Sequence, residues 1–300
     1  MERIDICCIG HITLDKVVTK RSAVFMAGGT AFYFSNALSR MDVRYRLVTA
    51  VASDGMAAVR NLRLAGVDVT VLPSAHTVYF ENIYGENQDH RTQRVLRTAD
   101  PFPAAGLPEA GARIFHLGPL LADDMPPGLI PALAAKGRVS LDAQGYLRKV
   151  VDQRVVPVDW PEKMEALRHV SILKTNEAEM AVLTGQAGIR QGARILADWG
   201  VSEVVITLGS QGSVIYTEQR FHDIPAYAPT TSVVDATGCG DTYMAGYLYQ
   251  RNKGIPAQGA GEFAAAMATL KIEASGPFNG TEDDVLELLA SRQGTAFVSR

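Results

Sequence analysis

Short apolar segments alternate with longer amphipathic or alanine-rich segments over most of the chain. A short apolar run between glycine or polar loops is typical of a strand buried on both faces of a sheet, whereas the longer segments favour helices. Their alternation predicts an α/β fold with a mostly parallel sheet covered by helices on both faces. The expected strands are 4–9, 45–51, 67–72, 113–117, 139–141, 170–173, 204–206 and an antiparallel 213–216, and the expected helices include 31–41, 57–65, 195–199 and 261–274.

The pattern changes between residues 77 and 97. Residues 77–84 are β-prone, residues 85–88 (Gly-Glu-Asn-Gln) are typical of a turn, and residues 91–97 again favour an extended backbone. This arrangement predicts a β-hairpin. Its second strand has few apolar residues, so we expect the hairpin to project from the main sheet, either as a lid over a site or as a surface feature.

A glycine-rich turn, Asp235-Ala236-Thr237-Gly238-Cys239-Gly240-Asp241, precedes a run of residues compatible with a helix. A turn of this kind leaves backbone N–H groups unpaired at the positive end of a helix, which suits a phosphate group. A carboxylate there would repel the phosphate unless it had a task of its own. Asp241 could take a proton from a hydroxyl that attacks the phosphate, or it could be an ordinary helix N-cap.

Polar and glycine residues also stand where a bound ligand is expected. In open α/β sheets ligands bind beyond the carboxyl ends of the strands. Asp15 follows the first strand and Gln144 follows the strand 139–141, so both are candidates to bind hydroxyl groups. Gly28-Gly29 precedes the helix 31–41 and would let a ligand approach the backbone closely, although in isolation a plain loop is the better explanation of the pair.

Two further motifs follow later strands. Asn176 and Glu179 come after the strand 170–173, and their spacing is also that of a helix capping box. Thr207, Gly209 and Gly212 lie in a segment that follows the strand 204–206 and that we interpret as a strand-to-strand turn.

Composition excludes several classes of protein. The 300 residues are 47% hydrophobic and 20% charged with a net charge of -3, which is typical of a soluble globular chain and gives no electrostatic footprint for nucleic acid. No apolar run approaches the ~20 residues of a membrane span, so no membrane partner is expected. Three cysteines without a pairing pattern favour a reducing, cytoplasmic location. The first strand lacks a G-x-G-x-x-G motif, which argues against a nicotinamide-dependent oxidoreductase.

The order of these motifs along the chain resembles the ribokinase-like family of carbohydrate kinases, the phosphofructokinase B type. The resemblance covers nearly the whole chain. It implies one doubly wound α/β domain over residues 1–300 with a small β lid around 77–97, to which 12–25 could also contribute. It also implies transfer of the γ-phosphoryl group of ATP to a hydroxyl with the help of Mg²⁺.

The resemblance assigns roles to the motif residues. Asp241 matches the catalytic base, and the amides of Gly238, Cys239 and Gly240 match the anion hole. Asn176 and Glu179 match the motif that organises magnesium and the nucleotide phosphates, while Thr207, Gly209 and Gly212 match the nucleotide-binding loop. Asp15, Gly28 and Gly29 match positions that hold the sugar. A potassium site near Asp235 and Ser275 is a further implication. Separately, the edges of the predicted lid hairpin could pair with a second subunit, so we expect a homodimer through the lid.

The chain departs from the family pattern in the acceptor region. Phe32-Tyr33-Phe34 stands where the family often has an asparagine that contacts the sugar, which argues against ribose. The run from Asp142 to Arg148 looks most like the inositol kinase branch, so a cyclic polyol is the favoured acceptor. Another sugar, a nucleoside, ADP as the donor, or a sugar-binding regulatory protein without catalysis remain as alternatives.

Overall fold

A nine-stranded sheet forms the centre of the molecule. The computed structural model describes residues 3–18, 23–84, 91–104, 107 and 111–296. The run of parallel strands is, in spatial order, β13 (Glu203–Thr207), β12 (Ile172–Asn176), β9 (Arg138–Asp142), β8 (Ala112–Gly118), β1 (Ile4–Gly10), β4 (Tyr45–Val51) and β5 (Asp68–Pro73). Two antiparallel strands, β14 (Ser213–Thr217) and β15 (Arg220–Ile224), extend one edge.

The chain reverses direction across the sheet at β1. It runs from β1 to β4 and β5 on one side and then crosses to β8, β9, β12 and β13 on the other. The predicted doubly wound, mostly parallel sheet is therefore confirmed, and the predicted antiparallel strand at 213–216 is confirmed as part of β14. Such a reversal leaves a crevice beyond the carboxyl ends of the strands, where ligands bind in folds of this kind.

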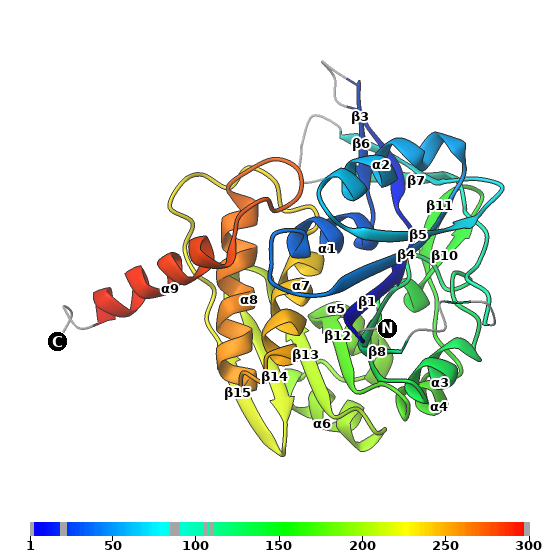
Figure 1. Ribbon diagram of the computed structural model, residues 1–300. Coiled ribbons are helices and arrows are strands. Elements are labelled where there is room, and N and C mark those ends of the chain that lie inside the picture. Colours follow the sequence, from blue (N-terminus) through cyan, green and yellow to red (C-terminus); the bar gives the residue numbers. More distant parts are fainter. Residues whose placement is uncertain (1–2, 19–22, 85–90, 105–106, 108–110, 297–300) are drawn as a thin grey trace.

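Helices cover both faces of the main sheet (Figure 1). One face carries α1 (Thr30–Leu38), α2 (Met56–Leu64), α7 (Cys239–Asn252), α8 (Ala257–Ile272) and α9 (Glu282–Ala296). The opposite face carries α3 (Leu129–Ala134), α4 (Lys163–Leu167), α5 (Glu177–Thr184) and α6 (Ile189–Asp198). Successive residues of β1 serve the two cores, because side chains alternate along a strand: Cys8 packs on the α7 side and Cys7 on the other.

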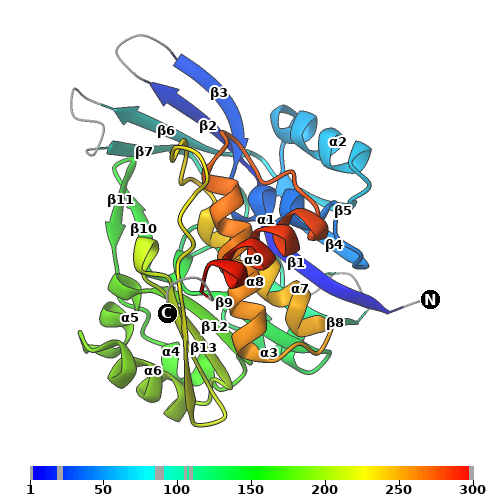
Figure 2. The ribbon, with the colours of Figure 1, turned by 90° about the vertical axis from the view of Figure 1, so that its left-hand side faces the viewer.

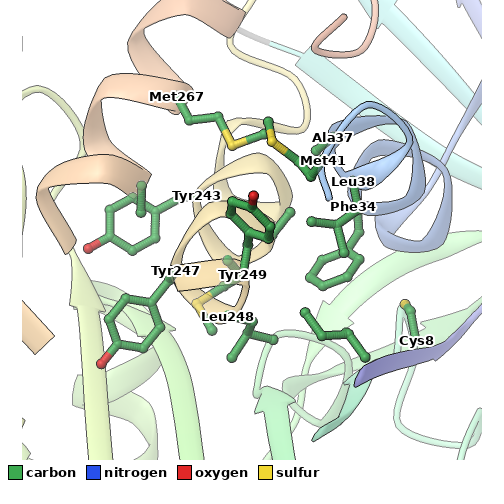
Figure 3. Packing of buried hydrophobic residues seen from close by; sticks show 14 of the residues in the cluster. Cys8, Phe34, Ala37, Leu38, Met41, Tyr243, Tyr247, Leu248, Tyr249 and Met267 are labelled. Atoms are coloured by element: carbon green, nitrogen blue, oxygen red, sulfur yellow. The ribbon is translucent and has the colours of Figure 1, made fainter. Parts of the chain in front are cut away.

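Helix α7, which begins at the glycine-rich turn, is held on both sides. Side chains of α1, α7 and α8 fill the space beside β1 (Figure 3), and the buried face of α7 includes Tyr243 and Tyr247. Their hydroxyls are paired, with Ser213 Oγ at 2.7 Å and Glu203 Oε2 at 2.7 Å respectively. A Cβ atom at Gly246 would lie 2.9 Å from the sulfur of Met267, so the absence of a side chain allows α8 to approach α7 closely.

A second sheet has six strands and is larger than the predicted hairpin. Its order is β10 (Arg148–Val151), β11 (Arg154–Pro157), β7 (Arg91–Arg97), β6 (Val78–Tyr84), β2 (Thr13–Val18) and β3 (Ala23–Gly28). The predicted hairpin strands are β6 and β7, which pair antiparallel. The predicted turn at 85–88 and part of the predicted contribution of 12–25 lie outside the described residues.

The sequence analysis missed the strands β10 and β11. They join through Asp152 and Gln153, both in the left-handed region with φ 47° and 64°. A two-residue hairpin needs two such residues and usually signals itself by Asn-Gly or Asp-Gly, and that signal is absent here. Three excursions from the main sheet supply the second sheet: β2 and β3 follow β1, β6 and β7 follow β5, and β10 and β11 follow β9. All three leave from carboxyl ends of main-sheet strands, so the second sheet stands beyond that end of the main sheet (Figure 2).

Candidate active site

The glycine-rich turn places Gly238 as the N-cap of α7, with φ +77°. A Cβ atom at this position would lie 2.2 Å from the ring of Tyr33, so both the backbone conformation and the space require glycine. The amide of Cys239 donates to the carbonyl of Ala236 at 3.2 Å. The three predicted anion-hole residues thus lie together at the start of a helix of four turns, but the amide of Cys239 already has a partner in the turn.

Asp241 lies in the first turn of α7 and is partly buried. Burial, reinforced by the neighbouring carboxylate of Asp142, raises the pKa of Asp241 to about 7, although Lys174 and a hydrogen bond from Thr30 oppose the rise. A carboxyl group with a pKa near 7 can hold or release a proton at physiological pH, which is the property that a general base needs. It does not cap the helix, because the N-cap is Gly238.

Lys174 is a charged residue to which the sequence analysis assigned no role. Its ammonium nitrogen lies 2.8 Å from Asp142 Oδ2, and both side chains are buried. Burial alone would lower the pKa of Lys174, but the charges of Asp142 and Glu179 outweigh it and raise the pKa above its usual value. A Cβ atom at Gly240 would lie 3.2 Å from the ammonium, so a permanent positive charge lies directly under the turn. The sequence feature that could have identified Lys174 is its position inside the apolar segment 172–176.

Asn176 and Glu179 form a capping box at the start of α5. The Asn176 side chain accepts from the Glu179 amide at 2.8 Å, and Glu179 Oε2 accepts from the Asn176 amide at 2.8 Å. The other oxygen, Glu179 Oε1, is buried and has no hydrogen-bond partner among the described residues, with an Arg148 nitrogen 4.0 Å away. Burial, together with Asp142, raises the pKa of Glu179. Neither Asn176 nor Glu179 lines either of the two cavities described next.

A cavity of about 570 Å³ lies between the turn and the second sheet. Predominantly polar groups line it, and the predicted residues Asp15, Gly29, Gln144, Gly238 and Asp241 are among them. The residues that the sequence analysis did not assign include Thr13, Tyr33, Asn82, Gln93 and Arg148. Gly28 does not line the cavity itself. A Cβ atom there would lie 2.5 Å from Asp15 Oδ2, so Gly28 leaves room for the Asp15 carboxylate, which accepts from Thr13 Oγ1 at 2.7 Å.

A second cavity of about 590 Å³ lies on the other side of the turn. Its walls are mainly apolar and come from the loop before α7 and from α8. The predicted residues Thr207, Gly209, Gly212, Cys239 and Gly240 line it, together with Tyr227, Ala265 and Ile272. Burial raises the pKa of the Cys239 thiol to about 11, so this cysteine is a packing residue of the wall. Ala236 lines both cavities, so the two spaces meet at the glycine-rich turn.

The charged groups near the turn fit a magnesium ion that is bound mostly by substrate phosphates and water. Among the described residues no three His, Cys, Asp or Glu side chains lie close enough to hold a metal by themselves. Magnesium is usually bound through one or two carboxylates, and Glu179 Oε1 is a buried carboxylate oxygen that accepts no hydrogen bond from the residues that the structure describes. Across the described part of the chain, no helix is long and apolar enough to cross a membrane.

Comparison with known proteins gives matches over nearly the whole chain. The family model described as pfkB family carbohydrate kinase matches residues 3–284. A cytidine kinase of Thermococcus kodakarensis is 28% identical over 263 residues, which cover 84% of this chain and 90% of that protein.

Two solved structures are similar over almost their full length. The sulfate complex of a pyrophosphate-dependent kinase in the ribokinase family has a TM-score of 0.83 and 28% identity, and the match covers 94% of this chain and 99% of that one. A pyrophosphate-dependent myo-inositol-1 kinase, converted into a myo-inositol-3 kinase by one Asn-to-Leu and one Ser-to-Leu substitution, has a TM-score of 0.81 and 27% identity, covering 96% and 99%.

Proposed function

The chain belongs to the pfkB family of carbohydrate kinases and has a ribokinase-like α/β fold, and from this premise we propose that it transfers the γ-phosphoryl group of ATP to a hydroxyl of a cyclic polyol of the myo-inositol type. One observation carries the proposal: a polar cavity and an apolar cavity meet at the glycine-rich turn, and Asp241 lies on the polar side. The acceptor occupies the polar cavity and the donor nucleotide the apolar one.

The apolar cavity is the reason to propose ATP rather than pyrophosphate as the donor. Its volume of about 590 Å³ and its wall of Tyr227, Ala265 and Ile272 suit a flat nucleobase. Pyrophosphate has no apolar part and would gain nothing from such a wall. Thr207, Gly209 and Gly212 lie at the edge of the same cavity. ADP would fit the same walls, so a donor assay must separate the two nucleotides.

The chain's own residues supply the chemistry of transfer. Asp241, in its carboxylate form, takes the proton of the acceptor hydroxyl while that oxygen bonds to the γ-phosphorus. The bond from the γ-phosphorus to its bridging oxygen breaks, and ADP leaves with the electron pair. The amides at the start of α7 and the ammonium of Lys174 stabilise the negative charge on the transferring group. Glu179 would hold Mg²⁺ through its second carboxylate oxygen, and the ion would supply positive charge to the donor phosphates.

Polar groups from both sheets line the acceptor cavity and favour a polyol. Gln144 follows β9 of the main sheet, whereas Asp15 of β2, Asn82 of β6, Gln93 of β7 and Arg148 of β10 come from the second sheet. Asn82 and Gln93 are a cross-strand pair, with Gln93 Nε2 3.0 Å from Asn82 Oδ1. In the inositol kinase with changed specificity the two substituted positions are 11 residues apart, as Asn82 and Gln93 are here. The equal spacing supports the pair as part of an inositol-type acceptor site.

The second sheet would act as the lid of this site. Its strand β3 is an edge strand that pairs with β2 on one side, and Val24 and Phe25 of β3 are 52% and 69% exposed. An unpaired edge with exposed apolar side chains favours pairing with a second copy, so a homodimer through the lid belongs to the proposal. The free cysteines Cys7, Cys8 and Cys239 agree with the proposed cytoplasmic location.

The experiment is turnover with Mg²⁺ across donors and acceptors. ATP, ADP and pyrophosphate are each combined with myo-inositol, ribose, fructose and cytidine, and the matched control is Asp241→Asn. We expect turnover with ATP and myo-inositol that falls by about 10²- to 10⁴-fold in the control. Cytidine as the preferred acceptor would replace the polyol by a nucleoside. Binding of these acceptors without turnover on any donor would favour a sugar-binding regulatory protein.

A further inference from the structure

Lys271 is a buried cation directly behind the glycine-rich turn. It lies in the last turn of α8 and is 1% exposed. Its ammonium nitrogen donates to the backbone carbonyl of Asp235 at 2.6 Å and lies 3.4 Å from Asp235 Oδ2. The ammonium also lies 5.9 Å from the centre of the Tyr33 ring. Burial of an ammonium group costs free energy unless oxygen atoms accept its hydrogen bonds. Here the oxygens of Asp235 offset that cost.

The carboxylate of Asp235 connects this cation to the turn. Oδ1 accepts from the Thr237 amide at 2.9 Å, and the Gly276 amide also donates to the carboxylate. Although burial would raise the pKa of Asp235, the hydrogen bonds from Thr237, the charge of Lys271 and the Gly276 amide lower it. Asp235 therefore stays ionised beside the ammonium.

Further contacts join the end of α8 to the start of α7. The amide of Val234 donates to the carbonyl of Ile272 at 2.8 Å. The ring of Tyr33, which faces the ammonium, also lies against Gly238, where a Cβ atom would be 2.2 Å from the ring. Lys271 therefore influences the backbone of the turn from two sides, through its contact with Asp235 and through its contact with Tyr33.

The same place is where a potassium ion was predicted, near Asp235 and Ser275. A potassium ion held there would use the carbonyl and carboxylate oxygens of Asp235. The ammonium of Lys271 already contacts both groups, and a second cation beside it would meet like charge at close range. The residues present therefore do not fit a potassium ion at Asp235.

We propose that Lys271 is a positioning residue whose ammonium is a built-in monovalent cation: it holds Asp235 and so fixes the turn that binds the transferring phosphoryl group. This inference rests on the proposed phosphoryl transfer but not on the identity of the acceptor. It has two consequences. The wild type needs no monovalent cation from solution, and removal of the ammonium creates a site that a small cation can fill.

The test compares Lys271→Met with Lys253→Met. Lys253 is a matched control because its ammonium also lies near a carboxylate, Glu282 Oε1 at 2.7 Å, and over an aromatic ring, Tyr249 at 4.8 Å, but on the surface and away from the turn. Each protein is assayed in potassium, methylammonium and tetramethylammonium chloride at equal ionic strength. Thermal unfolding without substrates is measured in the same three salts.

We expect wild-type turnover to change less than about twofold between the salts. For Lys271→Met we expect kcat to fall by about 10- to 100-fold with little change in acceptor KM, since a displacement of the turn acts on the reacting phosphoryl group. Methylammonium or potassium, but not the bulky tetramethylammonium, should recover much of the lost kcat. The same small cations should raise the melting temperature of Lys271→Met and leave those of the wild type and Lys253→Met unchanged.

Three results would overturn the inference. They are a wild type that requires potassium, a Lys271→Met variant with full kcat, and a folded Lys271→Met variant whose activity and melting temperature respond equally to all three salts. If the wild type has no turnover on any donor and acceptor, the proposed function fails. The melting experiment still decides whether Lys271 replaces a bound cation, because it needs neither substrate.

Discussion

Asp241 carries a charge that the folded protein destabilises. Its carboxyl group is buried next to the carboxylate of Asp142, and the positive charge of Lys174 compensates only partly, so its pKa rises to about 7. A general base must be deprotonated before it can accept the proton of the acceptor hydroxyl. The same burial that gives Asp241 a useful pKa therefore makes its working form scarce in acid.

The pH dependence of turnover follows from this residue. We expect kcat/KM to rise about tenfold per pH unit below pH 7 and to level off above it, because only the carboxylate form acts as a base. Steady-state kinetics between pH 5 and 9 at saturating donor measures the profile. A profile that is flat between pH 5 and 8 would contradict the role of Asp241.

The control for this profile is Asp241→Asn, whose residual activity should lack the step near pH 7. The substitution should lower the activity of the protein but raise its stability at high pH. Folding raises the pKa of Asp241, so the protonated form stabilises the native state at low pH, and this contribution is lost as the pH rises through about 7. At pH 8 we expect the neutral variant to gain on the order of 2–4 kcal/mol in unfolding free energy, since each tenfold change in proton affinity corresponds to about 1.4 kcal/mol.

At the scale of the element, helix α5 serves two purposes at its first turn. The capping box of Asn176 and Glu179 pairs two backbone amides that the helix would otherwise leave unpaired. One Glu179 oxygen is used in the cap, and the other is buried and has no hydrogen bond with any described part of the chain. The spacing of Asn176 and Glu179 left both capping and metal binding open. The structure shows the capping box, and metal binding by the second Glu179 oxygen remains a proposal.

The two purposes can be separated by substitution. Glu179→Gln keeps an oxygen that can accept from the Asn176 amide but loses the charge, so we expect the Mg²⁺ concentration for half-maximal turnover to rise by about 10- to 100-fold with little change in melting temperature. Asn176→Ala should instead cost about 1 kcal/mol of stability. Mg²⁺ titrations and thermal unfolding measure both effects.

Glu177→Gln is the matched control, because Glu177 lies in the same helical turn and is exposed. It should leave the magnesium dependence unchanged. An equal change in magnesium dependence for Glu177→Gln and Glu179→Gln would mean that only the general charge of the helix matters, and would contradict a specific role of Glu179.

At the scale of the whole molecule, the acceptor cavity depends on two sheets that meet. The main sheet contributes the carboxyl ends of its strands, and the second sheet contributes side chains from β2, β3 and the β6–β7 pair. On that pair, Asn82 and Gln93 face the cavity, whereas the next cross-strand pair, Glu81 and Arg94, points to the other face because side chains alternate along a strand.

Specificity should therefore be sensitive to the second sheet. We expect Asn82→Leu/Gln93→Leu to raise the acceptor KM by about tenfold or to move the phosphate to another hydroxyl, since two polar groups that bind the acceptor are lost. Kinetics and ³¹P NMR of the product measure the two effects. Arg94→Leu is the control on the opposite face, and an equal change in that variant would show a general effect on the sheet.

The sequence by itself determined the main sheet and the local chemistry. Apolar runs predicted the parallel strands, because a strand that is buried on both faces must consist of apolar residues. The turn from Asp235 to Asp241 was identifiable because glycine spacing and a following helix are local features of the sequence. The sequence also identified Asp15, Gln144 and the 207–212 turn as residues at strand ends, and the structure places them at the two cavities.

Only the tertiary structure decided which distant residues act together. No sequence motif points to Lys271, and only its place in an apolar segment points to Lys174, but folding buries both against carboxylates on either side of the turn. The six-stranded sheet was underestimated because its strands come from three separate excursions, and the β10–β11 hairpin lacks a glycine turn. Burial, pKa and the meeting of two cavities depend on contacts between remote segments, and no local pattern encodes such contacts.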